Sequence, residues 1–283
     1  MLKILAARVR QGHRTIRFPK GPPPALPDRY RGLPLVDDAR CAAADGCRAC
    51  ADVCPVQAIE VGSGAGARPR FDLGRCLFCT DCTDACPPGA IRMGSEWRMA
   101  VSRREDLLYV PSEAEGLRLA EGMAIELKRL FGRSLRFREV SAGGCNGCEA
   151  DSNVLGTVGW DMGRFGVQFV ASPRHADGLW VTGPVSRNMR LALEKTWQAV
   201  PEPRIVVAVG ACAISGGPFR GSPEVCDGVT ELLPVDLYVP GCPPHPLTIL
   251  DGLLRLLGRP ASTAGRADAS TAPPLPRGSR PVS

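Results

Sequence analysis

Short apolar runs alternate with helix-like patterns in the second half of the chain. Mostly apolar runs predict five strands, at 135–140, 167–171, 179–182, 204–209 and 235–239. Apolar residues at helical spacing predict two helices, at 187–199 and 246–257. Because strands and helices alternate, we expect an α/β flavodoxin-like domain with a mainly parallel sheet.

A further amphipathic helix is predicted between Ser112 and Gly132, ahead of the first of these strands. Ser112 and Glu115 have the spacing of a capping box, and Gly132 is a stop signal. One face of this helix would carry apolar side chains at 3.6-residue spacing, namely Leu117, Ala120, Met123, Ala124, Leu127 and Leu130.

The two ends of the chain have patterns of their own. The segment up to about residue 18 predicts a short amphipathic helix that rests on a membrane, contacts a membrane subunit or simply extends from the surface. Its apolar and basic residues are Leu2, Leu5, Val9, Lys3, Arg8 and Arg10. The basic residues interrupt the apolar run, so no signal peptide is expected and we place the protein in the reducing cytosol. Residues 259–283, rich in Pro, Ser, Ala and Arg, are expected to form a disordered tail.

Composition and charge add three constraints. The 283 residues are 44% hydrophobic and carry a net charge of +6, from 35 Lys and Arg against 29 Asp and Glu. The basic residues are spread along the sequence without interleaved aromatic residues, so nucleic-acid binding is not expected. No apolar run reaches the ~20 residues that span a bilayer. The chain has 13 cysteines, and in a reducing compartment that number favours metal ligation over disulfides.

The positions of the cysteines indicate two domains. Eight lie between residues 41 and 86, five lie between 145 and 242, and the 58 residues between the two groups contain none. In the first group the run Cys-x2-Cys-x3-Cys-Pro occurs twice, beginning at Cys47 and at Cys79, and this offset of 32 residues indicates a duplicated unit. Cys76 lies three residues before the second run. Cys41 lies six residues before the first, and the extra residues 42–46 predict a bulged loop.

These spacings predict two [4Fe–4S] clusters. In bacterial two-cluster ferredoxins three close cysteines hold one cluster, and the fourth, which precedes a Pro, reaches the neighbouring cluster. The two ligand sets are therefore Cys41, Cys47, Cys50 and Cys86, and Cys76, Cys79, Cys82 and Cys54. Zinc is the alternative, because it also binds paired Cys-x2-Cys motifs. The glycine run at 62–66 is followed by Arg68 and Pro69 instead of a helix, so neither NAD nor a flavin is expected.

The second group of cysteines predicts a third [4Fe–4S] cluster. All but one of its members follow predicted strands in glycine-rich loops, and these are Cys145, Cys148, Cys212 and Cys242. Since the carboxyl ends of parallel strands meet at one edge of a sheet, the four thiolates should converge there. Cys226 is then left over. The alternatives are an exchange of Cys226 with Cys212, and a dithiol redox pair at Cys145 and Cys148.

The motifs resemble two known families. Residues 34–108, which include Cys76-Leu77-Phe78-Cys79, resemble the two-cluster ferredoxin subunit of formate hydrogenlyase and of complex I. Residues 112–258 resemble the small subunit of membrane-bound, energy-converting (group 4) [NiFe] hydrogenases, which is homologous to the cluster-bearing B subunit of complex I. This second resemblance rests on the motifs GCNGCE at 144–149, FVASPRHAD at 169–177, VTGPV at 181–185, GAC at 210–212 and VPGCPP at 239–244. The B subunit of complex I has two adjacent cysteines at this first ligand site. In this chain Asn146 and Gly147 separate Cys145 from Cys148, and this separation resembles that in hydrogenases.

The resemblance implies a fused electron-transfer subunit of an oxidoreductase complex. Electrons would pass between a donor, such as a ferredoxin, a formate dehydrogenase or a carbon monoxide dehydrogenase, and a [NiFe] hydrogenase-like large subunit. Membrane antiporter-like subunits would be further partners, with this chain peripheral on the cytoplasmic side of the membrane. The alternatives are the same relay in a complex I-like quinone oxidoreductase that lacks Ni, and a non-catalytic zinc-binding assembly module.

The expected domains are an extension at 1–33, a two-[4Fe–4S] ferredoxin domain of α+β class at 34–97, a linker at 98–111, a hydrogenase small-subunit-like domain at 112–258 and the tail at 259–283. Glu149 directly follows Cys148 and is a candidate proton relay, or else a surface or N-cap carboxylate. His245 and His175 are expected to have packing, hydrogen-bonding or interface roles rather than to be ligands.

Overall fold

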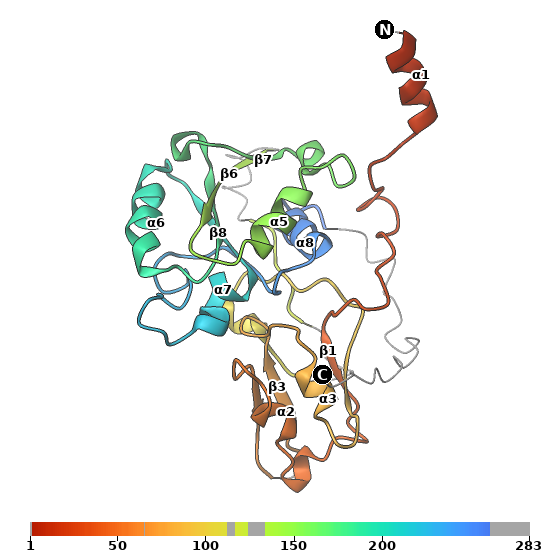
Figure 1. Ribbon diagram of the computed structural model, residues 1–283, viewed down its shortest axis with the longest axis vertical. Helices are drawn as coiled ribbons and strands as arrows, with labels where there is room; N and C mark the ends of the chain where they lie inside the picture. Colours follow the sequence, from red (N-terminus) through yellow and green to blue (C-terminus); the bar gives the residue numbers. More distant parts are fainter. Residues whose placement is uncertain (1, 65, 112–116, 124–133, 261–283) are drawn as a thin grey trace, which may run out of the picture.

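The chain folds into a small α+β unit and a larger α/β unit (Figure 1). The structure is a computed structural model that describes residues 2–64, 66–111, 117–123 and 134–260. Helix α1 (Leu2–Gln11) projects from the side of the α/β unit that lies away from the α+β unit (Figure 1).

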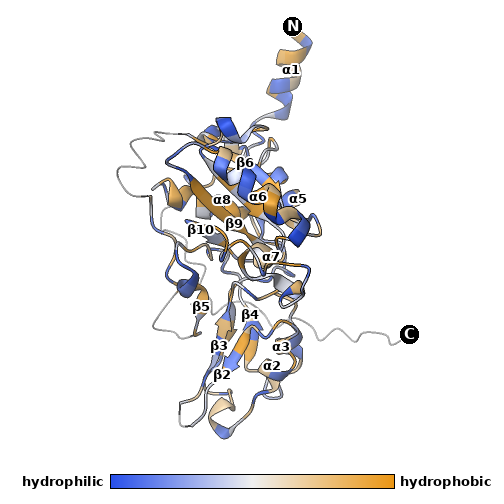
Figure 2. Cartoon of the chain, turned by 90° about the vertical axis from the view of Figure 1, so that its left-hand side faces the viewer, coloured by the Kyte–Doolittle hydropathy of each residue, from blue (hydrophilic) through white to orange (hydrophobic). Residues whose placement is uncertain are grey.

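The α/β unit is built on a five-stranded sheet in which every neighbouring pair of strands is parallel. Its strands are β6 (Leu135–Ser141), β7 (Val167–Phe169), β8 (Gly178–Thr182), β9 (Ile205–Val209) and β10 (Leu237–Val239), in the order β10-β9-β8-β6-β7. Strands β8 and β9 are buried along their whole length, and Figure 2 shows β9 as hydrophobic. Burial on both faces is typical of parallel strands covered by helices. The predicted mainly parallel sheet is confirmed.

Helices flank this sheet and begin at its loops. They are α5 (Gly147–Val154), α6 (Arg187–Ala199), α7 (Gly210–Ser215) and α8 (Pro246–Leu256), with the short 3-10 helices η3 (Met162–Phe165), η4 (Pro173–His175) and η5 (Gly217–Phe219). Helix α8 has ten buried residues and lies in the core, whereas α6 fully buries only Leu193 and lies on the surface. Both helices match their predicted segments.

The α+β unit has the duplicated construction that the 32-residue repeat predicts. Strand β1 (Pro34–Val36) pairs antiparallel with β4 (Ile91–Met93), and β2 (Ile59–Val61), β3 (Pro69–Asp72) and β5 (Leu108–Tyr109) form a second antiparallel sheet. The short helices α2 (Ala49–Asp52) and α3 (Asp81–Asp84) start 32 residues apart, as do β2 and β4. Two 3-10 helices, η1 (Ala43–Asp45) and η2 (Arg104–Leu107), complete the unit.

Residues 98–111 connect the two units and are built into both. Val101 and Tyr238 exchange two backbone hydrogen bonds, of 3.0 and 2.9 Å, while β5 at the far end of the segment pairs with β3. Val101 and Leu107 are fully buried. Ser215 Oγ in the α/β unit also donates a 2.9 Å hydrogen bond to the Gly74 carbonyl in the α+β unit. One hydrophobic core therefore runs through both units.

The predicted helix at 112–132 is wrong where the structure describes it. Residues 112–116 and 124–133 lie outside the described residues, and the described segment 117–123 is not helical. Its amides bond to other segments instead: Ala120 N donates to Ala100 O at 2.8 Å, and Met123 N donates to Leu256 O at 2.9 Å. Most of the expected tail, from residue 261 onward, also lies outside the described residues. Among the helices that are described, none is long and apolar enough to cross a bilayer.

Candidate metal centres

Cavity A lies in the α+β unit and is lined by one predicted ligand set, Cys41, Cys47, Cys50 and Cys86. The extra residues between Cys41 and Cys47 form η1 and end at Gly46, whose φ of 87° suits glycine. Cys47 N donates to Ala42 O at 3.1 Å and closes the loop. The insertion is therefore a bulge that returns the chain to the same cavity, which is how Cys41 joins the set despite its irregular spacing.

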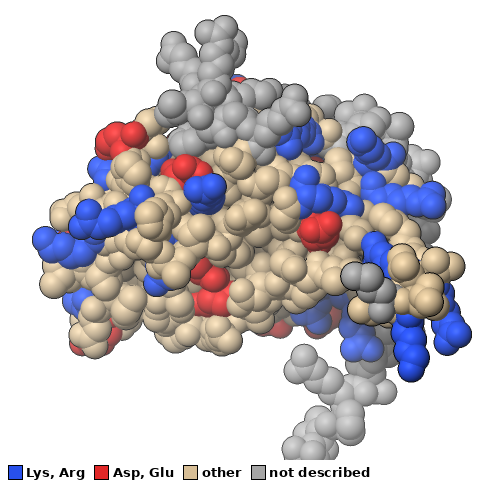
Figure 3. Space-filling model, turned by 90° about the horizontal axis from the view of Figure 1, so that it is seen from above, with Lys and Arg blue, Asp and Glu red and all other residues tan. Residues whose placement is uncertain are grey.

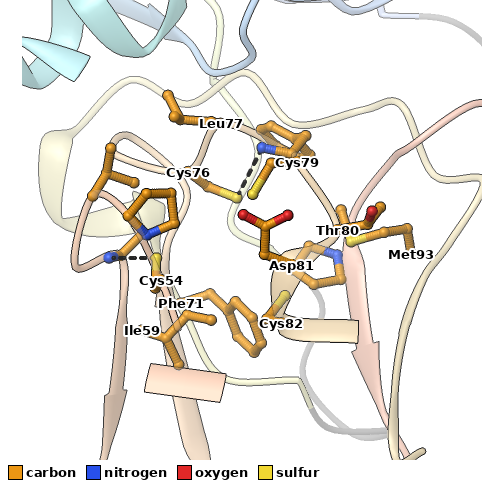
Figure 4. Close-up of a pocket in the computed structure, with 15 residues that line it drawn as sticks. Cys54, Ile59, Phe71, Cys76, Leu77, Cys79, Thr80, Asp81, Cys82 and Met93 are labelled. Atoms are coloured by element: carbon orange, nitrogen blue, oxygen red, sulfur yellow. Dashed lines mark hydrogen bonds between the residues drawn. The ribbon is translucent and has the colours of Figure 1, made fainter. Parts of the chain in front are cut away.

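Cavity B is lined by the second set, Cys54, Cys76, Cys79 and Cys82, whose side chains Figure 4 shows around it. Backbone amides point at two of these sulfur atoms: Ala58 N donates to Cys54 Sγ at 3.2 Å and Phe78 N to Cys76 Sγ at 3.4 Å. Amide donors of this kind stabilise negative charge on sulfur. The same contact recurs at the repeat position in cavity A, where Ala90 N donates to Cys86 Sγ at 3.3 Å.

Cavity C lies at the carboxyl edge of the parallel sheet and is lined by Cys145, Cys148, Cys212 and Cys242. The cysteines follow β6, β9 and β10, and helices α5 and α7 begin beside them. Two glycines make room for the sulfur atoms. A Cβ at Gly210 would lie 2.4 Å from Cys148 Sγ, and one at Gly217 would lie 2.7 Å from Cys212 Sγ. Cys145 and Cys242 are exposed, so this cavity reaches the surface.

Each of the three cavities contains at least one cysteine whose pKa is raised. Burial raises the pKa of the Cys50 thiol to about 11 and that of Cys76 and Cys212 to about 12, and it also raises the pKa of Cys148. A thiol with such a pKa keeps its proton at neutral pH unless a bound cation stabilises the thiolate. Metal binding in these cavities would therefore release protons.

The donor sets fit iron–sulfur ligation. Each cavity offers four soft sulfur donors, and amide N–H groups point at sulfur atoms in cavities A and B. Within the described part of the chain, no three His, Cys, Asp or Glu side chains are arranged as a site for a single metal ion.

The three cavities are arranged in series. Burial is the largest cause of the raised pKa of Cys82 in cavity B, and Cys50 of cavity A adds to it. Burial likewise raises the pKa of Cys242 in cavity C, with a contribution from Cys79 of cavity B. Helix α2, which carries Cys50 of cavity A, contacts α3, which carries Cys82 of cavity B. Leu77 and Phe78 of cavity B also line a pocket together with Cys242 of cavity C, so cavity B lies between A and C.

Glu149 lines cavity C and is buried, with 6% of its surface exposed. Its Oε1 accepts hydrogen bonds from Ser141 Oγ at 2.6 Å and Thr182 Oγ1 at 2.8 Å. It is thus not a surface carboxylate, although it does lie in the first turn of α5. A proton-relay role stays a prediction. Cavity B also contains a carboxylate that the sequence pattern did not reveal, Asp81, which interacts with Cys79.

The remaining candidate residues lie outside the cysteine sets. His245 Nδ1 accepts a 3.1 Å hydrogen bond from Leu247 N at the start of α8, and burial lowers the pKa of the His245 imidazole. His175 is exposed at the end of η4. Cys226 N donates a 2.9 Å hydrogen bond to Val185 O. Cys212 and Cys226 are the two candidates for one ligand position, and it is Cys212 that lines cavity C.

Comparisons with known proteins identify the class as iron–sulfur subunits of oxidoreductase complexes. Residues 40–90 match the family described as "4Fe-4S dicluster domain", and residues 145–256 match "NADH ubiquinone oxidoreductase, 20 Kd subunit". The "Probable membrane-bound hydrogenase subunit mbhJ" of Pyrococcus furiosus is 40% identical over 146 residues, which are 52% of this chain and 87% of that protein. The chain belongs to the NADH ubiquinone oxidoreductase 20 Kd subunit family, and it carries a dicluster domain in addition.

Two further relatives bear names from different complexes. "Formate hydrogenlyase subunit 7" of Escherichia coli is 43% identical over 136 residues, 48% of this chain and 53% of that protein. The B subunit of the NADH-quinone oxidoreductase of Bacteroides thetaiotaomicron is 44% identical over 110 residues, 38% of this chain and 56% of that protein. The chain thus spans about half the length of these two relatives.

Proposed function

We propose that this chain is the iron–sulfur electron-transfer subunit of a membrane-associated, energy-converting [NiFe] hydrogenase complex of the formate hydrogenlyase type. The observation that carries the proposal is the series of three four-cysteine cavities, in which α2 of cavity A contacts α3 of cavity B, and one pocket joins Leu77 of cavity B to Cys242 of cavity C. A [4Fe–4S] cluster in each cavity would supply one-electron redox chemistry, at the low potentials to be expected of ligation by cysteine alone.

The protein's own residues hold and shield these sites. The twelve cysteines supply the thiolates, Gly210 and Gly217 leave space for sulfur, and Ala58 and Ala90 donate amide hydrogen bonds to it. Cys145 and Cys242 are exposed at the open side of cavity C. A partner that covers this side would exclude water from the site, and we assign that place to the large subunit.

Cavity A lies at the other end of the series and would face the electron donor. The donor would be a ferredoxin, a formate dehydrogenase or a carbon monoxide dehydrogenase, and the membrane subunits would be of the antiporter type, with this chain on the cytoplasmic side. The proposed ferredoxin domain spans residues 34–97, and residues 98–111 link it to the hydrogenase small-subunit-like domain at 112–258. The α/β unit is flavodoxin-like, since its strands, counted from β6 along the chain, lie in the order 2-1-3-4-5.

A complex I-like quinone oxidoreductase without Ni is the second candidate. The relatives named as B subunits of NADH-quinone oxidoreductases favour it. Two observations favour the [NiFe] hydrogenase candidate. Two residues separate Cys145 from Cys148, and two relatives are named as hydrogenase and hydrogenlyase subunits. The sequence of the large-subunit partner distinguishes the two candidates, because a nickel site needs two Cys-x2-Cys pairs in that subunit.

The first test is anaerobic purification with metal analysis. We expect about twelve iron atoms per chain, as three [4Fe–4S] clusters require, and H2 evolution by the intact complex from a reduced dye. Zinc without iron would instead support an assembly module, and iron without H2 evolution would support the quinone-linked candidate.

Single cysteine variants test the ligand sets. Cys212→Ser should remove the electron paramagnetic resonance signal of one cluster and about a third of the iron. Cys226→Ser is the matched control and should leave both unchanged. The opposite result would show that Cys226 is the ligand.

A further inference from the structure

Residues 2–20, here called the basic arm, begin with a helix that has no partner in this chain's described residues. Helix α1 has no buried residue, and its large apolar side chains Leu2, Ile4, Leu5 and Val9 are between 62% and 83% exposed. Figure 1 shows α1 standing clear of the α/β unit. A ten-residue helix is marginal in water by itself, because most helices are stabilised by packing of an apolar face.

The basic arm carries the whole net charge of the protein. Six basic residues precede the first acidic residue, Asp28, and the other 29 Lys and Arg are balanced by 29 Asp and Glu. All six are exposed: Lys3, Arg8, Arg10, Arg14, Arg17 and Lys20. Seen from the side on which α1 projects, basic side chains gather at the right-hand edge of the molecule (Figure 3). The arm is therefore suited to an anionic surface.

Helix geometry places the apolar and basic groups in a definite arrangement. Leu2, Leu5 and Val9 fall on one face, at spacings of three and four residues. At 100° per residue, Arg10 lies on one flank of this face and Arg8 lies on the other, while Lys3 and Ile4 both point away from it. Basic residues that flank a narrow apolar face are typical of helices lying in a membrane interface, where long basic side chains reach the headgroups.

The base of the arm is fixed to the α/β unit. Ile16 N donates to Gly159 O at 2.8 Å, and Arg164 donates to Ile16 O at 2.7 Å and to Phe18 O at 2.6 Å. Phe18 is buried and packs edge-on against Trp97, with ring centroids 5.4 Å apart. The arm is thus not a loose tail, because these contacts fix the point from which α1 projects.

We propose that the basic arm binds the anionic lipid headgroups of a membrane surface, with Leu2, Leu5 and Val9 inserted at the interface. Three features favour a lipid surface rather than an acidic protein as the binding partner of the arm. They are its positive charge, the basic residues that flank its apolar face, and its fixed base. The inference goes beyond the proposed function, since it names the segment that touches the membrane and does not depend on which complex the chain joins.

The test is flotation of the full-length chain with lipid vesicles. It should bind vesicles of phosphatidylcholine with about a third phosphatidylglycerol, lose binding at high salt and not bind pure phosphatidylcholine. The double variant Arg8→Gln/Arg10→Gln should bind about 30-fold more weakly, from roughly 1 kcal/mol per basic residue. The control Arg174→Gln/Lys195→Gln, which removes two exposed basic residues of the α/β unit, should change binding far less.

A second pair of variants tests the orientation of the helix. Leu5→Ser should weaken vesicle binding, whereas Ile4→Ser should not, although Ile4 is the more exposed of the two. Equal effects of the two variants, equal binding to neutral vesicles, or no vesicle binding by the intact chain would each overturn the proposal. Iron content is measured alongside: an iron-free chain that still floats contradicts the proposed function alone.

Discussion

At the scale of single residues, cavity C depends on glycine. Gly210 has a φ of +89°, and a Cβ there would lie 2.4 Å from Cys148 Sγ, a ligand candidate that packing already confines. A side chain at this position would therefore meet both backbone strain and a sulfur atom.

If the proposed three [4Fe–4S] clusters share the iron equally, we expect Gly210→Ala to lose the cluster of cavity C and about a third of the iron. Gly221→Ala is a matched control, because Gly221 has a φ of +78° with nothing within 4 Å of a Cβ. Iron analysis and electron paramagnetic resonance after reduction measure both. Similar losses in the two variants would mean that strain, rather than contact with sulfur, is responsible.

Glu149 offers a test of proton transfer beside the same cavity. Glu149→Gln keeps an oxygen that accepts from Ser141 and Thr182 but cannot carry a proton, so we expect lower H2 turnover in the complex with unchanged iron content. Glu149→Ala leaves two hydroxyls without this acceptor and should destabilise the fold by about 1–3 kcal/mol. Full turnover in the Gln variant would dispose of the relay and leave Glu149 a structural acceptor.

At the scale of elements, the mostly apolar helix α8 carries a buried carboxylate. Asp251 is 0% exposed, and its Oδ2 accepts a 2.7 Å hydrogen bond from Arg255 Nε. Burial raises the pKa of Asp251, while Arg255 and Arg98 lower it and Glu96 adds slightly to the rise. Because the folded-state pKa lies above the unfolded one, the contribution of Asp251 to stability falls as pH rises from the unfolded pKa through the folded one.

Arg255→Leu removes the main partner of this carboxylate. We expect a loss of about 3–5 kcal/mol in the free energy of unfolding at neutral pH, as for other broken buried pairs. The loss should shrink toward acidic pH, where Asp251 takes up a proton. Anaerobic denaturant titrations at neutral and mildly acidic pH measure it. Arg190→Leu, which breaks the exposed pair with Glu194 on α6, should change little at either pH.

Elements with strong periodicity could be predicted from the sequence, and elements held by distant contacts could not. Helix α6 has the predicted bounds, and β6 and β9 begin within one residue of theirs. The described residues 117–123 also have helical spacing, yet their amides bond to Ala100 and Leu256, which are remote in sequence. Helices α5 and α7 were missed because both are short and begin in glycine-cysteine loops without an apolar period.

At the scale of the whole molecule, the two units share one core and should unfold together. Gly74 lies at the contact: a Cβ there would be 2.8 Å from Ile214 Cγ2 and 3.0 Å from Leu107 Cδ1. Its carbonyl also accepts the hydrogen bond from Ser215 Oγ. Interior packing transmits such a clash to both sides.

We expect Gly74→Ala to destabilise the protein by about 1–3 kcal/mol, as overpacking of a core does, and to lower the melting temperature of both units together. Calorimetry under anaerobic conditions measures this. Gly62→Ala, with nothing within 4 Å of its Cβ, is the control and should have little effect. Two separate transitions, with only one of them shifted, would show that the units are independent.

The cysteines that line cavities A and B could be grouped from their spacing, and those of cavity C from their positions after predicted strands, whereas the serial order of the cavities could not be predicted. Cys79 and Cys242 are 163 residues apart, and only the packing of the two units brings their cavities next to each other. The same holds for Asp81 and Glu149, which line cavities B and C beside residues from other loops and strands.

The threading of residues 98–111 through both units has a consequence for assembly. If cavities B and C belonged to separate polypeptides, dilution would part them, and unequal synthesis would leave one without its neighbour. Here a covalent backbone holds the two halves at a fixed effective concentration, and a single gene sets their stoichiometry at one to one.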